Sequence, residues 1–474
     1  MLGRIVAMFT SSRRSKQPGP GQMAAAVQDE AFRQLDRLAP LVGENARLAA
    51  NTETTHSDAD PSHPAQSIVR REAVLGTDQR VAGYSFTLRH GVNLRVMASS
   101  AHVRRLYDEV LLRNIQAMEL QRLLGHRLAF VAISAGSIGL PRLEQLPSAE
   151  TVFVVGPNDQ LSADPEAMLA RLSHFKSLGY RIGLHGTGAE SPEMTPFLKL
   201  AEFLLIDIGA NDIPAIKTQI ECAREQASAQ IFVATNIQTL DEFNVCAKLP
   251  FAFFQGPFVT SREQWSSPRM DTGRLKILQL LNKLRQEAEV GELTALIKQD
   301  PALSFKLLRY INSPGMGLLS KVGTPEQALF VLGRQKLYRW LTLLLFTSGQ
   351  TRGLDQALLE NALVRARLAE LLARDALSPA ERDEVFVAGV FSLLDVLLGA
   401  PMETVLKQVS LPALVNEALL HRRGIYAPYL RLAIACEQSD EEDISALAQA
   451  IGLDAQQVND LHIEALSWAQ QVGE

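Results

Sequence analysis

The chain has 474 residues, 47% of them hydrophobic, so it can bury the cores of about two to four domains. Its net charge of -5 argues against a general polyanion binder, and we expect no nucleic-acid partner. Its three cysteines lack CxxC spacing, which argues against a zinc pair or a disulfide framework. The N-terminus lacks the order of a secretory signal, and the apolar runs fall far short of the roughly 20 residues of a membrane helix. The sequence therefore predicts a soluble cytoplasmic protein.

Residues 1–67 are predicted to form a flexible N-terminal region, because much of it lacks large apolar side chains. Within it, good helix formers and a partial apolar stripe of Phe32, Leu35 and Leu38 predict a helix over residues 23–50.

From residue 68 to residue 268, short β-rich runs alternate with amphipathic segments. One of these segments begins with Asp164 and Pro165, a typical N-cap followed by a first-turn proline. Repeated strand-helix-strand units predict a parallel sheet wrapped by helices, and their number indicates an α/β barrel.

After SSPRMDTG the strand pattern stops, and residues 272–474 have the pattern of successive helices. Asp300 and Pro301 predict the N-cap and first turn of one of them. The sequence thus predicts two domains, a barrel over residues 68–268 and an all-α domain over residues 272–474, joined through residues 266–268.

The decapeptide GYRIGLHGTG, residues 179–188, raises two interpretations: a glycine-rich phosphate loop, or the strand end of a former acidic metal site. Glycines let backbone N–H groups approach an anion. A phosphate cradle, however, usually lies directly before a helix, whereas Ser191 and Pro192 delay the next helix here. We therefore interpret Gly186 and Gly188 as turn residues.

Five segments of the barrel region carry a recognisable pattern. They are IVRREAVLGTDQRVAGYSFTLR (68–89), GYRIGLHGTG (179–188), LLIDIG (204–209), VATNIQT (233–239) and FFQGPFV (253–259). In this order and spacing they resemble the EAL domain, a cyclic di-GMP phosphodiesterase barrel, in the divergent version fused to an HDOD domain. The resemblance implies a variant of the TIM barrel with its site at the carboxyl ends of the strands.

Active EAL domains hold Mg²⁺ or Mn²⁺ with carboxylates, and such cations require several oxygen ligands. At the matching ligand positions this chain carries other residues, and Leu205 stands at a lysine position. These substituted positions are Ser85, His185, Gly186, Thr235 and Gln238. The remaining candidates for ligand binding are Asp207, Gln255 and Gly256. On this resemblance we expect no catalytic residue, no metal and no cofactor. We interpret His185 as a loop histidine, because no second His or Cys stands at the spacing that a metal ligand pair would need.

The helical region resembles the HDOD domain, a relative of the HD phosphohydrolases, through residues 297–341 and through VFVAGVFSLLDVLLGAPM, residues 385–402. HD enzymes bind metal with a His-Asp pair, but here Leu394 stands at the histidine position and Asp395 remains. The only nearby histidine is His421. One histidine and one aspartate do not make a metal site, so we expect Asp395 to cap a helix or to bond across the bundle.

Three functions remain open. We favour a non-catalytic bacterial signalling protein, not an enzyme, that contacts other signalling proteins in cyclic di-GMP or related sensory and motility networks. The alternatives are a cyclic di-GMP receptor that does not hydrolyse its ligand, and a cyclic di-GMP phosphodiesterase. A receptor should present cations to two phosphates, yet Arg89 and Arg262, the nearest to the strand ends, are interpreted as surface charges. By resemblance, the barrel could also form a homodimer.

Overall fold

The structure, a computed structural model, describes ten stretches of the chain. They are residues 68–88, 101–118, 120–155, 164–186, 191–226, 230–262, 272–312, 320–347, 353–437 and 444–473. The predicted N-terminal region with its helix over 23–50, the linker 266–268, Arg89 and Gly188 lie outside these residues.

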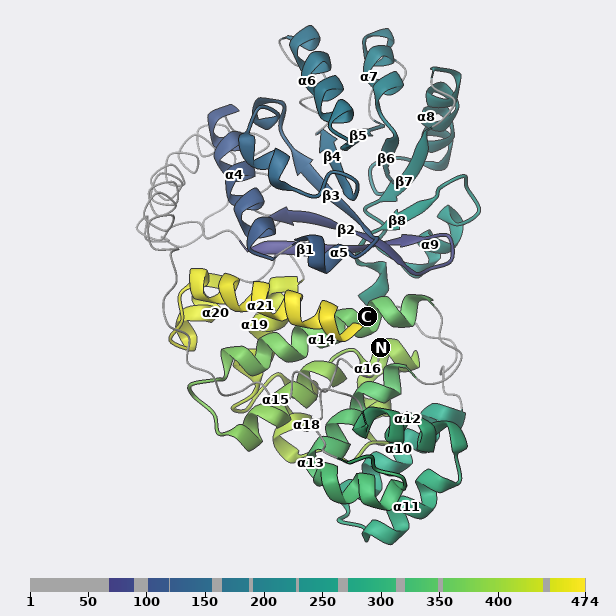
Figure 1. The fold of residues 1–474 in the computed structure, drawn as a ribbon, viewed down its shortest axis with the longest axis vertical. Helices are drawn as coiled ribbons and strands as arrows, with labels where there is room; N and C mark the ends of the chain where they lie inside the picture. Colours follow the sequence, from purple (N-terminus) through teal and green to yellow (C-terminus); the bar gives the residue numbers. More distant parts are fainter. Residues whose placement is uncertain are drawn as a thin grey trace, which may run out of the picture.

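Eight strands form a closed barrel in chain order, which confirms the predicted α/β barrel (Figure 1). Strand β1 runs antiparallel to both of its neighbours, β2 and β8, and the other neighbouring strands pair in parallel. The strands are β1 (Val69–Gly76), β2 (Val81–Leu88), β3 (Leu128–Ile133), β4 (Thr151–Val155), β5 (Arg181–His185), β6 (Phe203–Asp207), β7 (Ile231–Thr235) and β8 (Phe253–Gln255). The α-helices of this part are α4 (Ala101–Ala117), α5 (Leu120–Leu124), α6 (Pro165–Ser177), α7 (Thr195–Leu200), α8 (Ile213–Gln226) and α9 (Leu240–Cys246).

The second part contains α-helices, as predicted, and lies below the barrel in Figure 1. Its helices are α10 (Thr272–Arg285), α11 (Val290–Lys298), α12 (Pro301–Ile311), α13 (Pro325–Phe346), α14 (Gly353–Leu372), α15 (Pro379–Phe391), α16 (Leu394–Leu398), α17 (Met402–Leu406), α18 (Ala413–His421), α19 (Ala427–Glu437), α20 (Ile444–Ala450) and α21 (Ala455–Gly473). The predicted two-domain fold class is therefore confirmed.

Both helix starts that the sequence predicts are present. The Asp164 side chain accepts a hydrogen bond from the Ala167 backbone N–H at 3.0 Å, and Pro165 is the first residue of α6. Asp300 likewise accepts from the backbone N–H groups of Ala302 and Leu303 at the start of α12. Such caps satisfy backbone donors that have no partner within the helix.

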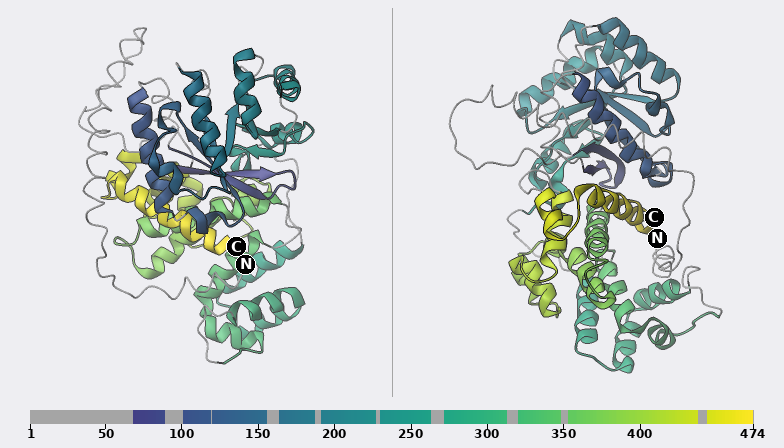
Figure 2. Two further views of the ribbon diagram at one scale, coloured as in Figure 1. Left: turned by 45° about the horizontal axis from the view of Figure 1, so that its top comes forward. Right: turned by 90° about the vertical axis from the view of Figure 1, so that its left-hand side faces the viewer.

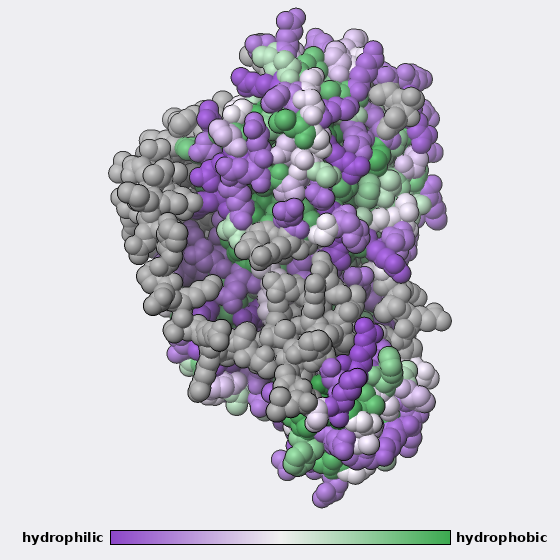
Figure 3. Space-filling model, in the orientation of Figure 1, coloured by the Kyte–Doolittle hydropathy of each residue, from purple (hydrophilic) through white to green (hydrophobic). Residues whose placement is uncertain are grey.

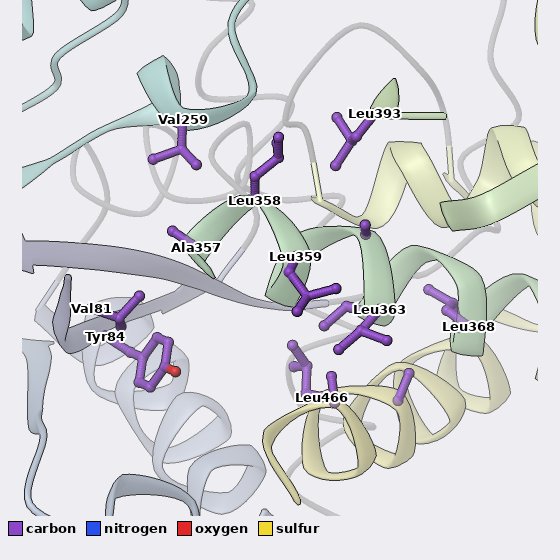
Figure 4. Close-up of a cluster of buried hydrophobic side chains, with 14 of the residues drawn as sticks. Val81, Tyr84, Val259, Ala357, Leu358, Leu359, Leu363, Leu368, Leu393 and Leu466 are labelled. Atoms are coloured by element: carbon purple, nitrogen blue, oxygen red, sulfur yellow. The ribbon is translucent and has the colours of Figure 1, made fainter. Parts of the chain in front are cut away.

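The two parts share one hydrophobic core. Helix α14 lies against β2 and against the 3₁₀ turn η4 (Pro257–Thr260), and α21 contacts the barrel near α5. Figure 4 shows Val81, Tyr84 and Val259 of the barrel beside Ala357 and Leu358 of α14. Figure 2 shows α14 and α21 along this side of the barrel from two further directions. The helical domain is thus packed directly on the barrel.

The outer surface mixes residue types. On the face drawn in Figure 3, hydrophilic residues cover much of the upper part, and hydrophobic residues appear between them in smaller areas. Exposed apolar side chains include Phe305 and Phe330, which are 64% and 88% exposed. Among the described residues, no helix combines the length and apolar character needed to cross a membrane.

Candidate functional site

The lower interior of the barrel is filled by apolar side chains. Phe130, Phe203 and Phe253 meet at ring-centroid distances of 5.4 to 6.3 Å. Aliphatic residues of β1, β4, β6 and β7 complete this cluster; they are Val74, Val152, Val154, Leu205 and Val233. A packed interior of this kind leaves the carboxyl ends of the parallel strands, here called the mouth, as the place for a ligand. Leu205, which the sequence interpretation matched to a lysine position of EAL domains, belongs to this apolar cluster and not to the mouth.

Polar residues follow immediately above the cluster. Side chains alternate between the two faces of a strand, so Ser85 points into the barrel while Tyr84 and Phe86 belong to the outer core. His185, Asp207 and Thr235 are the last residues of β5, β6 and β7. Asp207 pairs with Thr235 in the ladder between β6 and β7. The structure therefore places the predicted positions of β2, β5, β6 and β7 around one mouth.

The sequence interpretation missed Glu72. Strand β1 lies between β2 and β8, and Glu72 is the Cα partner of Ser85 and shares its strand face with Val74 of the apolar cluster. Its Oε2 accepts a hydrogen bond from Gln255 Nε2 at 2.8 Å, and its Oε1 lies 3.2 Å from Arg70 Nη2. A carboxylate thus stands opposite Ser85. The sequence did carry a signal for this carboxylate. Arg70 and Glu72 alternate with the outward-facing residues of β1, on the same face as the apolar Val74.

Asp207 is held by the loops that follow β6 and β7. Its Oδ1 accepts hydrogen bonds from the Ala210 backbone N–H at 3.0 Å and from Asn236 Nδ2 at 3.1 Å. Gln238 Nε2 in turn donates to Asn236 Oδ1 at 2.5 Å. Gln238 is exposed beside the mouth, and the Thr235 hydroxyl donates to the backbone oxygen of Ile206 at 3.2 Å. The carboxylate is therefore oriented by neutral donors.

His185 is half-buried at the end of β5. Burial lowers its pKa to about 4, and the negative charge of Asp207 opposes this shift without reversing it. The imidazole is therefore neutral near pH 7. Gly186 follows it, and a Cβ at that position would lie 2.8 Å from Gln219 Oε1 and 3.1 Å from Ile206 Cγ1.

The turn after β8 fixes Gln255. Gly256 has φ of 154°, and a Cβ there would lie 2.1 Å from the backbone oxygen of Ile237. The backbone N–H of Ile237 donates to the backbone oxygen of Gln255 at 3.1 Å. Gly256 thus allows the two loops to pack closely beside Gln255.

The residues of the mouth that the structure describes do not fit a carboxylate-bound metal. Among the residues that the structure describes, no three His, Cys, Asp or Glu side chains are grouped closely enough to hold a metal ion. Glu72 is engaged by Arg70 and Gln255, and Asp207 by Asn236 and the Ala210 N–H. Hard divalent cations need more oxygen ligands than these two carboxylates offer.

The helical domain places Leu394 in its core, fully buried, and Asp395 beside it with 3% exposure. Arg262 lies just beyond η4. It donates from Nε to Asp395 Oδ2 at 2.7 Å and from Nη2 to the backbone oxygen of Ser392 at 2.8 Å. The predicted partner of Asp395 is thus an arginine of the barrel part. Arg262, interpreted as a surface charge, instead makes this contact because the helical domain packs against the barrel. His421 is exposed at the end of α18.

A second polar contact joins the two parts next to Ser85. The Tyr84 hydroxyl lies 2.6 Å from Glu360 Oε2 of α14 and accepts from Arg127 Nη1 at 2.9 Å. Arg127 Nη2 lies 3.6 Å from Glu360 Oε1, and all three residues are buried. Burial, together with the charge of Glu360, raises the pKa of Tyr84 far above its usual value, so the hydroxyl stays protonated. The network ties β2 to the helical domain.

Comparison with known proteins agrees with this two-part architecture. Residues 268–406 match the HDOD domain family. The cyclic di-GMP phosphodiesterase CdgJ of Vibrio cholerae is 26% identical over 406 residues, which cover 85% of this chain and 92% of CdgJ. The uncharacterized protein YuxH of Bacillus subtilis is 26% identical over 311 residues, 65% of this chain and 75% of YuxH. Among solved structures, the PaMucR phosphodiesterase in complex with c-di-GMP is 18% identical with a TM-score of 0.34, covering 40% of this chain and 94% of that one.

The fold and the family match define a two-domain protein with an α/β barrel and a helical domain. The barrel is EAL-like and the helical part contains an HDOD domain, as the sequence predicted.

One prediction is wrong. The chain was expected not to be an enzyme, but a relative that matches 85% of it is named a cyclic di-GMP phosphodiesterase. The expectation was drawn from the residue types at single motif positions. It did not include Glu72, a carboxylate that the antiparallel strand β1 brings opposite Ser85 in the mouth.

Proposed function

We propose that this chain acts in cyclic di-GMP signalling and recognises cyclic di-GMP at the barrel mouth. The observation that carries the proposal is the polar group formed by Arg70, Glu72 and Gln255 directly above the apolar cluster. The similarity to CdgJ over most of both chains supports the choice of ligand.

The chemistry of the mouth suits both halves of such a ligand. A guanine edge presents N–H donors, and the carboxylates of Glu72 and Asp207 and the Gln255 amide are acceptors. Arg70 offers a guanidinium to a phosphate, for which the bidentate geometry of arginine is well suited. The Phe130 and Phe253 rings form an apolar floor below this polar group. Asp207, Gln255 and Gly256 are therefore proposed as ligand-binding residues, with Glu72 and Arg70 added to them.

A second candidate function is hydrolysis of cyclic di-GMP, favoured by the name of CdgJ. The described donors do not fit a multi-ligand metal site, so no chemical step is assigned to them. We also propose domain limits of 68–268 and 272–474, protein partners for the signalling output, and a homodimer through the barrel.

Isothermal titration of the full chain with cyclic di-GMP tests the proposal, first in EDTA and then with Mg²⁺ or Mn²⁺. Each sample is then separated by chromatography to detect the linear product. Glu72→Gln should weaken binding by about tenfold or more, because it removes a charged acceptor. The control Glu225→Gln changes an exposed glutamate in the last turn of α8, which leads to the amino end of β7 and so lies at the end of the barrel opposite the mouth; it should bind as the unchanged chain does.

Binding that Glu72→Gln weakens and Glu225→Gln does not would support recognition at the mouth. Linear product formed in the metal-containing samples would establish the hydrolytic candidate in addition. A chain that shows no heat and no product, or that binds equally well with either substitution, would overturn the proposed site.

A further inference from the structure

The helical domain contains a cavity of about 460 Å³ that lies apart from the barrel mouth. Helices α13, α14 and α21 and the start of α15 form its walls. Five cationic side chains line it, namely Lys336, Arg339, Arg367, Arg374 and Arg382. This volume falls within the usual range of about 300–1,000 Å³ for sites that bind small molecules.

Three carboxylates also line the cavity, and each is engaged by an arginine. Arg339 Nη1 lies 3.0 Å from Glu370 Oε1 and 2.7 Å from Asp383 Oδ1. Arg367 bonds Glu370 and Glu464, each at 3.0 Å. Burial raises the pKa of Glu370, but the two guanidinium groups outweigh it and hold that pKa below its usual value. Glu370 is therefore ionised and helps to hold Arg339 and Arg367 in place.

The cations exceed the carboxylates by two. Among the described residues, no carboxylate forms an ion pair with Lys336 on α13 or with Arg382 on α15. Arg382 is half-buried and Lys336 is exposed, so both can reach a ligand that enters from solvent. A site with two uncompensated positive charges favours a dianion.

One wall is aromatic. Trp468 of α21 is 8% exposed and packs edge to face against Phe386 at 6.0 Å. The guanidinium carbon of Arg367 lies 5.7 Å from the ring centroid of Trp468. A ligand that changes the charge next to Arg367 changes the surroundings of this indole, so Trp468 provides a fluorescence signal for occupancy.

We infer that this cavity binds a small phosphate-bearing anion, up to about the size of a mononucleotide. A phosphate carries about -1.5 to -2 charges at pH 7, which matches the excess of two cations. The guanidinium of Arg382, which no described carboxylate engages, can give a phosphate a bidentate contact, and Lys336 adds a second positive charge. The phosphate can belong to a free inorganic anion or to a nucleotide, and the two sources differ in whether a base and sugar fill the remaining volume.

The test is titration of the full chain with inorganic pyrophosphate and, separately, with AMP, followed by calorimetry and by tryptophan fluorescence. The double substitution Lys336→Gln with Arg382→Gln should weaken the affinity for at least one of the two by about tenfold or more. The matched control removes two cations from α12, Lys306→Gln with Arg309→Gln, and should leave that affinity unchanged. Tighter binding of pyrophosphate identifies a free anion, and tighter binding of AMP identifies a nucleotide.

A Trp468→Phe variant places the ligand independently of affinity. It should remove the fluorescence change while the calorimetric affinity stays within about threefold of the unchanged chain's. The inference is overturned if neither anion binds at millimolar concentration, if both double substitutions weaken binding equally, or if the fluorescence change persists without Trp468.

Discussion

The contact between Tyr84 and Glu360 gives a sharp test of how the two domains are held together. Tyr84→Phe removes a hydroxyl that lies 2.6 Å from the Glu360 carboxylate and accepts from Arg127 at 2.9 Å. Glu360 and Arg127 are both charged and buried, and the hydroxyl also lies 2.8 Å from Gln470 Oε1 of α21. A hydrogen bond to a charged group contributes about 1.5–3 kcal/mol, and the remaining Arg127–Glu360 pair at 3.6 Å offsets part of the loss. We expect the free energy of unfolding to fall by about 2 kcal/mol.

The assay is thermal unfolding of the full chain, followed by circular dichroism. For domains of this size about 2 kcal/mol corresponds to a decrease in Tm of about 4–8 °C. Tyr338→Phe is the matched control, because the Tyr338 hydroxyl is buried and has no hydrogen-bond partner among the described residues. That control should stay within about 0.5 kcal/mol of the unchanged chain. A Tyr84→Phe decrease no larger than that of Tyr338→Phe would refute the proposed link.

Three further predictions concern the ion pair, the mouth and the apolar cluster. Arg262→Gln leaves the Asp395 carboxylate without its cation. Because the Arg262 side chain is 43% exposed, we expect the free energy of unfolding to fall by only about 1 kcal/mol. An unchanged Tm in thermal unfolding would contradict this. The pKa of His185 is about 4 in the folded chain against its usual 6.5, so the unfolded chain takes up a proton first on acidification. Urea unfolding should therefore show stability falling from pH 6.5 to pH 4.5, by up to about 1.4 kcal/mol per pH unit. The fall should be smaller in His185→Gln. Equal pH dependence of the two chains would contradict this. Phe130→Ala opens a cavity in the barrel and should lower the free energy of unfolding in urea by about 3–5 kcal/mol. The control Phe330→Ala, at an 88% exposed position, should change it by less than about 0.5 kcal/mol. Similar values for both variants would be evidence against the packed interior.

The sequence predicted those features that local patterns determine. Alternating strand and helix segments predicted the barrel, and Asp164 and Asp300 predicted two helix starts, because capping depends on residues within one turn. The same reasoning placed Asp207 and Gln255 at one end of the barrel, since carboxyl ends of parallel strands meet there.

Glu72 and Arg262 could not be assigned in this way. Glu72 reaches the mouth only because β1 is inserted antiparallel between β2 and β8, which a pattern of single strands does not reveal. Arg262 finds Asp395 across 133 positions of sequence, so its partner depends on how the domains pack. The sequence did not predict the cavity in the helical domain for the same reason, because its charged residues come from four helices.

Strand β2 places neighbouring residues on two functional surfaces. Ser85 faces the mouth opposite Glu72, and Tyr84, the residue before it, bonds Glu360 of the helical domain. On the other side of β1, Gln255 bonds Glu72, and the chain continues through η4 to Arg262 and its contact with Asp395. Both strands that flank β1 therefore connect the mouth to buried polar contacts with the helices. Because packed interiors resist small displacements, a ligand that moves β2 or β8 must also strain or shift these contacts. This arrangement gives the barrel and the helical domain a direct mechanical connection at two separate points.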